Sequence, residues 1–221
     1  MAYDSDPPKH LDVDKGGVTR AQPTREIIEP RDPKAGPVTA VRMVLLQSSL
    51  SQLRQHGYLE QYRSLVDPDV LALLTSEIAP GWVPVDVARA HYDACDKLLL
   101  SPEQIMAIGQ DVGGVVGDAV VVSPAKKEHD PDFDLWAALG QIHRFWARVY
   151  RGGSVQVVKL GPKEQLIESF GFTLDRSPYF RYAKLGAIKQ VYGGFGVQVT
   201  SAELVSYSAG RDESVIRVTW L

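Results

Sequence analysis

The side chains that could carry out chemistry in this sequence are few and widely spaced. The 221 residues include five histidines and a single cysteine, Cys95. One thiol allows neither an intrachain disulfide nor a thiolate-rich metal site. A catalytic nucleophile needs a base or a metal beside it, and no spacing in this sequence indicates such a pair. We therefore expect no catalytic residues, no metal site and no enzymatic activity.

Aromatic and polar side chains in the second half of the chain could instead line a binding pocket. His143 and Trp146 lie three residues apart in an expected helix, so they are neighbours on its surface. Trp146, Phe170 and Tyr182 come from three expected elements, and His143 and Glu203 could supply orienting hydrogen bonds. These five residues are the candidate site for a small apolar or aromatic ligand. The alternative is an ordinary amphipathic core with polar side chains at its rim.

The elements that must position these residues alternate over residues 133–221 as helix, strand, strand, helix, strand, strand. Helices are expected over Phe133–Tyr150 and Pro178–Tyr192, the second beginning at an N-cap serine followed by proline. A helical start within residues 162–168 competes with the second strand. The pattern of β-branched and alternating apolar residues predicts four strands, Ser154–Leu160, Gln165–Leu174, Gly196–Tyr207 and Ser214–Trp220.

Residues 38–122 indicate helices throughout. The expected helices are Val38–Gln55, Glu60–Val66, Pro68–Ile78, Pro84–Leu99 and Ser101–Val120. In the last of them, Gly109, Gly113 and Gly117 recur at a spacing of four and share one face. Each glycine weakens a helix by about 1 kcal/mol relative to alanine. We therefore expect another helix to approach this face closely, either within the chain or across a dimer.

These elements predict one α+β domain over residues 38–221. Its N-terminal helical half, residues 38–122, packs on a mixed half, residues 132–221, that holds a four-stranded antiparallel sheet and two helices. Residues 1–37 contain six of the 14 prolines and few apolar residues, so we expect a disordered or extended leader. Ile27 and Ile28 leave open that an extended arm docks on the body or on a partner.

Charge and hydropathy exclude several classes of partner. The net charge is −3, so no basic field favours nucleic acid. No run of about 18 apolar residues is present, so we expect no membrane span. The first residues are acidic and carry prolines, without the basic and apolar regions of a signal peptide. A cytoplasmic protein is the expectation.

The order of elements over roughly residues 40–221 resembles the 4-vinyl-reductase-type domain. Its superfamily also holds haem-dependent NO/O2 sensor domains and Golgi-transport (TRAPP) subunits, and the organisation is similar to that of an uncharacterised myxobacterial branch. The resemblance implies a small-molecule-sensing or adaptor domain, often dimeric, with a pocket between helices and sheet. It rests on the segments GGSVQVVKL, SPYFRYAKLGAIKQVYGGFG and AELVSYSAGRDESVIRVTW.

The sequence departs from two ligand patterns of these relatives. Phenol-sensing members bind zinc through an upstream cysteine and Glu-x2-Cys-x7-Cys, whereas this chain has Glu203-x2-Ser206-x7-Ser214, and hydroxyls are poor zinc ligands. Haem-binding members carry a proximal histidine and a Tyr-x-Ser-x-Arg motif. That motif is missing here, and His91 or His143 would qualify as ligands by residue type alone. We therefore expect neither zinc nor haem, and no other cofactor.

The sequence thus predicts a non-enzymatic small-molecule-binding or regulatory module that forms a homodimer. The alternative is a protein-interaction adaptor without a ligand, and a haem gas sensor ranks behind both. A buried apolar cavity would favour a ligand. An exposed contiguous apolar patch would favour the adaptor.

Overall fold

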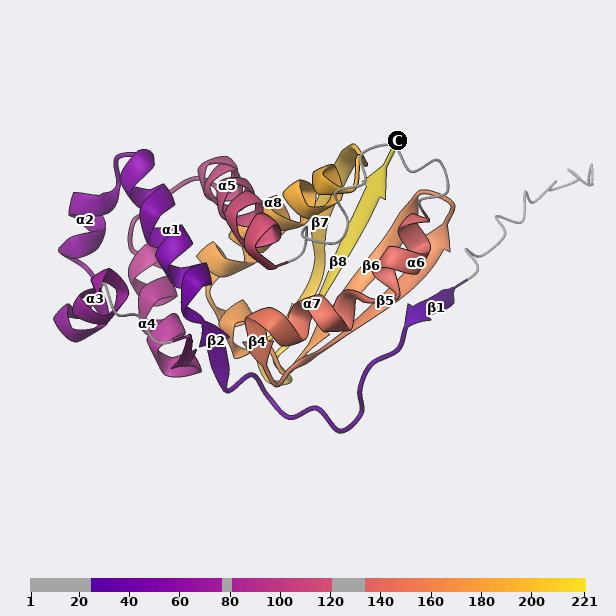
Figure 1. Ribbon diagram of the computed structural model, residues 1–221, viewed down its shortest axis with the longest axis horizontal. Helices are drawn as coiled ribbons and strands as arrows, with labels where there is room; N and C mark the ends of the chain where they lie inside the picture. The colour runs from indigo at the N-terminus through magenta and orange to yellow at the C-terminus, as the bar shows by residue number, and fades with distance from the viewer. Residues whose placement is uncertain (1–24, 77–80, 121–133) are drawn as a thin grey trace, which may run out of the picture.

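The structure, a computed structural model, describes residues 25–76, 81–120 and 134–221. Figure 1 shows helices α1 to α4 gathered at one end of the molecule and the larger sheet at the other, with α5, α7 and α8 between them. No helix in the described residues is long and apolar enough to cross a membrane. The first five helices are α1 Met43–Gln55, α2 Leu59–Arg63, α3 Pro68–Thr75, α4 Val85–Asp96 and α5 Pro102–Val120.

The N-terminal half is not purely helical, which corrects the expectation from the sequence. Ala40–Arg42 forms strand β2, and it pairs antiparallel with β3 (Trp82–Pro84) and β4 (Tyr150–Arg151). The expected helices that began at Val38 and Pro84 therefore begin only at Met43 and Val85. A β-branched run beside a proline favours an extended chain, and a strand of three residues is too short for its period to be read.

The larger sheet confirms the α+β class but has one strand more than expected. Its five strands are all antiparallel in the order β1-β5-β6-β8-β7. Side chains of Val155, Val157, Ile167, Ile216 and Val218 alternate toward the helices and form a buried core. The bounds are β1 Glu26–Glu29, β5 Ser154–Gly161, β6 Glu164–Phe170, β7 Val199–Ser208 and β8 Glu213–Trp220.

The additional strand comes from the segment expected to be a leader. β1 pairs with the edge of β5, with Ile27 opposite Val158, and lies along that edge in Figure 1. Arg25 forms an ion pair with Glu168 at 2.9 Å. An extended arm therefore docks on the body at residues 26–29, while residues 1–24 lie outside the described part of the chain.

The expected helix Phe133–Tyr150 is broken into two pieces. α6 spans Leu135–Leu139 and α7 spans Ile142–Val149. Gly140 and Gln141 lie between them, and glycine lowers the cost of leaving the helical path. The expected linker, residues 123–131, and the start of that helix lie outside the described residues. Farther along, the 3-10 turn η1 (Thr173–Arg176) precedes α8 (Pro178–Gly194), whose N-cap is Ser177 as predicted.

Helices α5 and α8 make the most extensive helix contact in the described chain. A Cβ added at Gly109 would lie 2.5 Å from Cα of Ala183, and one at Gly113 would lie 2.7 Å from Cα of Ala187. The close approach predicted from the glycine spacing is confirmed at these two positions, and it is intramolecular. A Cβ at Gly117 would meet nothing within 4 Å.

Candidate ligand-binding site

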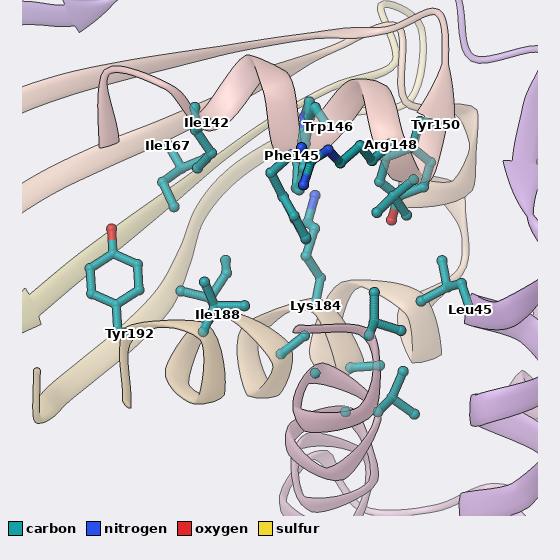
Figure 2. Close-up of a pocket in the computed structure, with 18 of the residues that line it drawn as sticks. Leu45, Ile142, Phe145, Trp146, Arg148, Tyr150, Ile167, Lys184, Ile188 and Tyr192 are labelled. Carbon is teal, nitrogen blue, oxygen red and sulfur yellow. The ribbon is translucent and has the colours of Figure 1, made fainter. Parts of the chain in front are cut away.

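A cavity of about 440 Å³ lies between α5, α7, α8 and the larger sheet (Figure 2). This volume falls in the range of small-molecule sites, roughly 300–1,000 Å³. Apolar side chains make up most of the wall, among them Leu45, Ile108, Val112, Val116, Leu139, Ile142, Phe145, Val149, Ile167, Ile188 and Val191.

The wall follows from the periodicity of two helices. In α7, Ile142, Phe145 and Trp146 recur at three to four residues and face the cavity. In α8, Lys184 and Ile188 are four residues apart and face them. Figure 2 shows Phe145 and Trp146 pointing from α7 toward α8, with Lys184 and Ile188 rising from α8 toward α7.

Two hydrogen-bond donors in this wall have no partner in the described part of the chain. They are Nε1 of Trp146 and the hydroxyl of Tyr179, both shielded from solvent. Burial raises the pKa of Tyr179 well above its usual value, and neighbouring Ser49 lowers it in part, although the two hydroxyls do not reach hydrogen-bond geometry. A buried donor left unpaired costs about 1–3 kcal/mol.

The one lysine in the wall belongs to a closed polar cluster. Lys184 Nζ donates to Oδ1 and Oδ2 of Asp175 at 2.6 and 2.8 Å, and to Ser214 Oγ at 3.1 Å. Ser214 Oγ in turn donates to Asp175 Oδ2 at 2.7 Å. All three residues are buried. The cluster is neutral overall, and its lysine is held by the carboxylate rather than free to act as a base or nucleophile.

A second buried polar cluster lies behind the cavity in the N-terminal half. His91 Nδ1 is 2.7 Å from the Tyr62 hydroxyl, and His91 Nε2 is 2.9 Å from Ser49 Oγ. Burial lowers the pKa of His91 to about 3, so the imidazole is neutral at physiological pH. Cys95 Sγ lies 3.7 Å from His91 Nε2, and burial followed by the charge of Asp96 raises the pKa of this thiol well above its usual value. A buried thiol of this kind is inert.

The structure brings one of the five predicted site residues, Trp146, into the cavity wall. His143 is on the outer side of α7, where Nδ1 lies 2.9 Å from Oε1 of Glu29 in the docked arm. Tyr182 is partly buried against both hydrophobic clusters and does not line the cavity.

The other two predicted residues lie on the sheet away from the cavity. Phe170 is covered by the guanidinium of Arg31 at 4.1 Å from the ring centroid. Glu203 is exposed on β7 and accepts a hydrogen bond from Ser201 Oγ at 2.6 Å. The prediction also left out Ser49 and Lys184, whose polar side chains gave no sign in the sequence that they would face an apolar space.

One of the positions that resemble a zinc site serves another purpose. Ser214 belongs to the cluster with Lys184 and Asp175. Within the described residues, no group of three or more His, Cys, Asp or Glu side chains could hold a metal ion.

Comparison with known proteins finds likeness in structure only. No protein-family model and no curated protein sequence matches the chain. An H-NOX protein from S. oneidensis in its Fe(II)NO ligation state superposes with a TM-score of 0.54 at 10% identity, over 81% of this chain and 99% of the other. A doubly substituted Tt H-NOX gives 0.52 at 13% identity, over 81% and 94%. An H-NOX structure used to probe haem distortion gives 0.51 at 11%, over the same shares.

At these identities the comparison establishes the fold, which is that of H-NOX domains. This is the fold of the haem-NO-binding relatives named from the sequence, and the comparison does not extend to the 4-vinyl-reductase or TRAPP relatives. One of these H-NOX structures was used to probe haem distortion, and a haem iron bound in this chain would need an axial His, Cys, Met or Tyr.

The residues of this cavity do not fit a histidine-ligated haem. Among the described residues that line it, none is His, Cys or Met. Both ring nitrogens of His91 are engaged by Tyr62 and Ser49, and His143 faces away. The lining phenols include Tyr150, and burial raises its pKa, which opposes the phenolate that would ligate iron.

Proposed function

We propose that this chain is a small-molecule-binding regulatory module on the H-NOX fold, and that its ligand is an apolar molecule held between α7 and α8. The observation that supports it is the apolar cavity with two unpartnered donors, Trp146 Nε1 and the Tyr179 hydroxyl. The described chain shows no arrangement of nucleophile and base at this cavity, and we propose a sensor or carrier rather than an enzyme.

A haem gas sensor is the second candidate. From the sequence alone, the haem gas sensor ranked behind both the ligand-binding module and the adaptor. The likeness to H-NOX structures favours it over the adaptor. The lack of His, Cys and Met in the described part of the cavity wall argues against it. An adaptor function has less support, because no observation on the described residues points to a protein partner, whereas the cavity points to a small ligand.

Native mass spectrometry of the purified protein, with an absorption spectrum, separates these candidates. We expect a small apolar molecule that organic extraction removes, no Soret band and no iron. A Soret band with one iron per chain would establish the haem candidate instead. The same spectra test the proposed homodimer.

A matched pair of tryptophan variants tests the site. Trp146→Phe keeps an aromatic ring but removes the N–H, and we expect weaker ligand binding. Trp82→Phe is the control, since Trp82 lies outside the cavity between Arg42 and Arg151. Binding that is unchanged in Trp146→Phe and in Trp146→Ala would place the ligand elsewhere.

A further inference from the structure

Two arginines of α7 lie where the cavity opens to solvent. Arg144 and Arg148 are four residues apart, so they share one face of the helix. Both line the cavity and both are exposed, which places them at its opening. Gln141, also exposed and lining the cavity, extends this row by one turn. Figure 2 shows the Arg148 side chain extending along α7 toward Trp146.

The described wall holds no acidic side chain to offset these charges, since no Asp or Glu is among its residues. Its third cation, Lys184, is already neutralised by Asp175 in a buried pair. Within the described residues Arg144 forms no ion pair, and Glu29, the acid that an ion pair brings to α7, is bound by His143 instead. The whole chain carries a net charge of −3, so the positive charge at the opening is a local feature.

The position of Arg144 is not explained by the stability of its own helix. α7 begins at Ile142, so Arg144 lies in the first turn, where the positive end of the helix dipole disfavours a cation. No acidic residue in that turn compensates. Arg148, by contrast, lies in the last turn, where a cation is favoured. An anion bound beside Arg144 would offset the unfavourable placement.

Such an anion would stay at the opening, because the interior offers it no partner. Most of the wall is apolar, and the one buried cation in it, Lys184, is paired. Burying a charge without a partner is costly. A guanidinium binds a carboxylate through charge-assisted and often bidentate hydrogen bonds. An apolar body could therefore fill the space between α7 and α8 while a charged head group remains with the arginines.

Resting on the proposed function, we infer that the cavity ligand is an apolar molecule with one anionic head group, such as a carboxylate. The hydrocarbon body lies against the apolar wall, which includes Ile142, Phe145 and Ile188. The head group binds Arg144 and Arg148 at the opening. A cationic amphiphile of the same shape is excluded by the same two charges.

The test compares para-butylbenzoate with its neutral amide, para-butylbenzamide, which has the same shape but no charge at neutral pH. The double variant Arg144→Met/Arg148→Met keeps long apolar stems over the wall and removes both charges. We expect it to bind the benzoate about tenfold more weakly than wild type does, the effect of one charge-assisted hydrogen bond at a partly exposed site. Its affinity for the amide and for butylbenzene should be unchanged. High salt should weaken binding of the benzoate to wild type and leave binding of the amide unchanged.

Arg54→Met/Arg63→Met is the matched control. Both arginines are exposed and lie outside the cavity wall, and their loss changes the net charge by the same amount. This variant should bind the benzoate as wild type does. An equal loss in the two double variants would show a long-range charge effect and overturn the head-group site.

The other outcomes separate the head-group site from the proposed function. Unchanged benzoate affinity in Arg144→Met/Arg148→Met, with Trp146→Ala still weakening all three probes, would overturn the anionic head group and leave the proposed function standing. A loss shared by all three probes in the double variant would mean that the arginines only cover the wall, which would also overturn it. If no probe and no co-purifying molecule bound to wild type, the proposed function would fail.

Discussion

The two sides of α8 are packed in opposite ways. Toward α5, Ala183, Gly186 and Ala187 allow backbone to meet backbone, so that a single added Cβ would overlap the neighbouring helix. Toward α7, Lys184 and Ile188 carry long side chains and still leave a cavity of about 440 Å³.

The comparison shows that the cavity is not a symptom of loose packing. On its other side the same helix makes the most extensive helix contact of the described chain, with backbone close to backbone. α7 is held away from α8 because it rests on β4 and β5 instead. Protein interiors are normally close-packed. An unfilled space beside so tight a contact is consistent with the ligand site we propose.

The largest expected effect comes from Lys184, which lies at the border between the two sides. Lys184→Met leaves the fully buried carboxylate of Asp175 without its cation, and breaking such a pair costs about 3–5 kcal/mol. Urea unfolding should show this loss. Combining it with Asp175→Asn should recover part of the stability. Lys159→Met, in a more exposed pair with Glu26, should change it by less than about 0.5 kcal/mol. Equal effects in the two lysine variants would contradict the role given to the buried cluster.

The face of α8 that packs on α5 is tested by adding one methyl group at each of two glycines. Gly186→Ala brings a Cβ against the backbone of Met106 and Gln110, and we expect a loss of roughly 1–3 kcal/mol in the free energy of unfolding. Gly117→Ala, where a Cβ meets nothing within 4 Å, should gain up to about 1 kcal/mol. Thermal unfolding of both variants measures the difference, and effects of the same sign would show that the contact is not tight.

The polar cluster behind the cavity predicts a pH dependence. The pKa of His91 falls from 6.5 in the unfolded chain to about 3 in the fold. The folded state therefore binds fewer protons between these values, so stability is full above pH 6.5 and decreases as the pH falls toward 3. His91 alone should contribute a loss of about 1.4 kcal/mol per pH unit in that window. Urea unfolding of His91→Gln at several pH values should show a correspondingly shallower slope. Parallel slopes would mean that His91 is not buried in the neutral form.

The smallest effect is expected from filling part of the cavity. Ala138→Leu adds side-chain volume into the cavity wall, and the unliganded protein should gain up to about 1 kcal/mol because the space is empty of protein atoms. Binding of butylbenzene should weaken. Ala137→Leu, exposed on the same helix, is the control and should leave binding unchanged. A loss of stability in Ala138→Leu would show that the wall cannot accept additional volume.

The sequence predicted the elements better than the site. The α+β class, the helix that begins at Ser177-Pro178 and the close contact at Gly109 followed from local signals, because caps, turns and glycine spacing act within a few residues. β2 and β3 did not, since strands of three residues show no period. The break in the expected helix at Gly140 could not be predicted from local signals either, because the apolar periodicity continues on both sides of it.

The cavity residues depended on information that one helix does not contain. The helical periodicity of α7 correctly predicted that Trp146 lines the cavity. His143, three residues earlier, lies on the side of the helix that faces away from it. Ser49 and Tyr179 line the same cavity because two distant helices pack, and a cavity is the volume that such packing leaves unfilled. No pattern within α1 or α8 specifies that volume.

The docked arm, residues 26–32, also covers the edge of the larger sheet at β5. β5 would otherwise present a free row of backbone groups, which can template pairing with another chain. β1 pairs along Val157–Lys159, and the backbone N–H groups of Arg31 and Asp32 continue the cover by bonding to Gln156 Oε1 and Ser154 Oγ. A protease that cut near Pro33 would remove this cover while leaving the cavity wall intact. The shortened protein would then be prone to strand exchange and fibre-like association along β5.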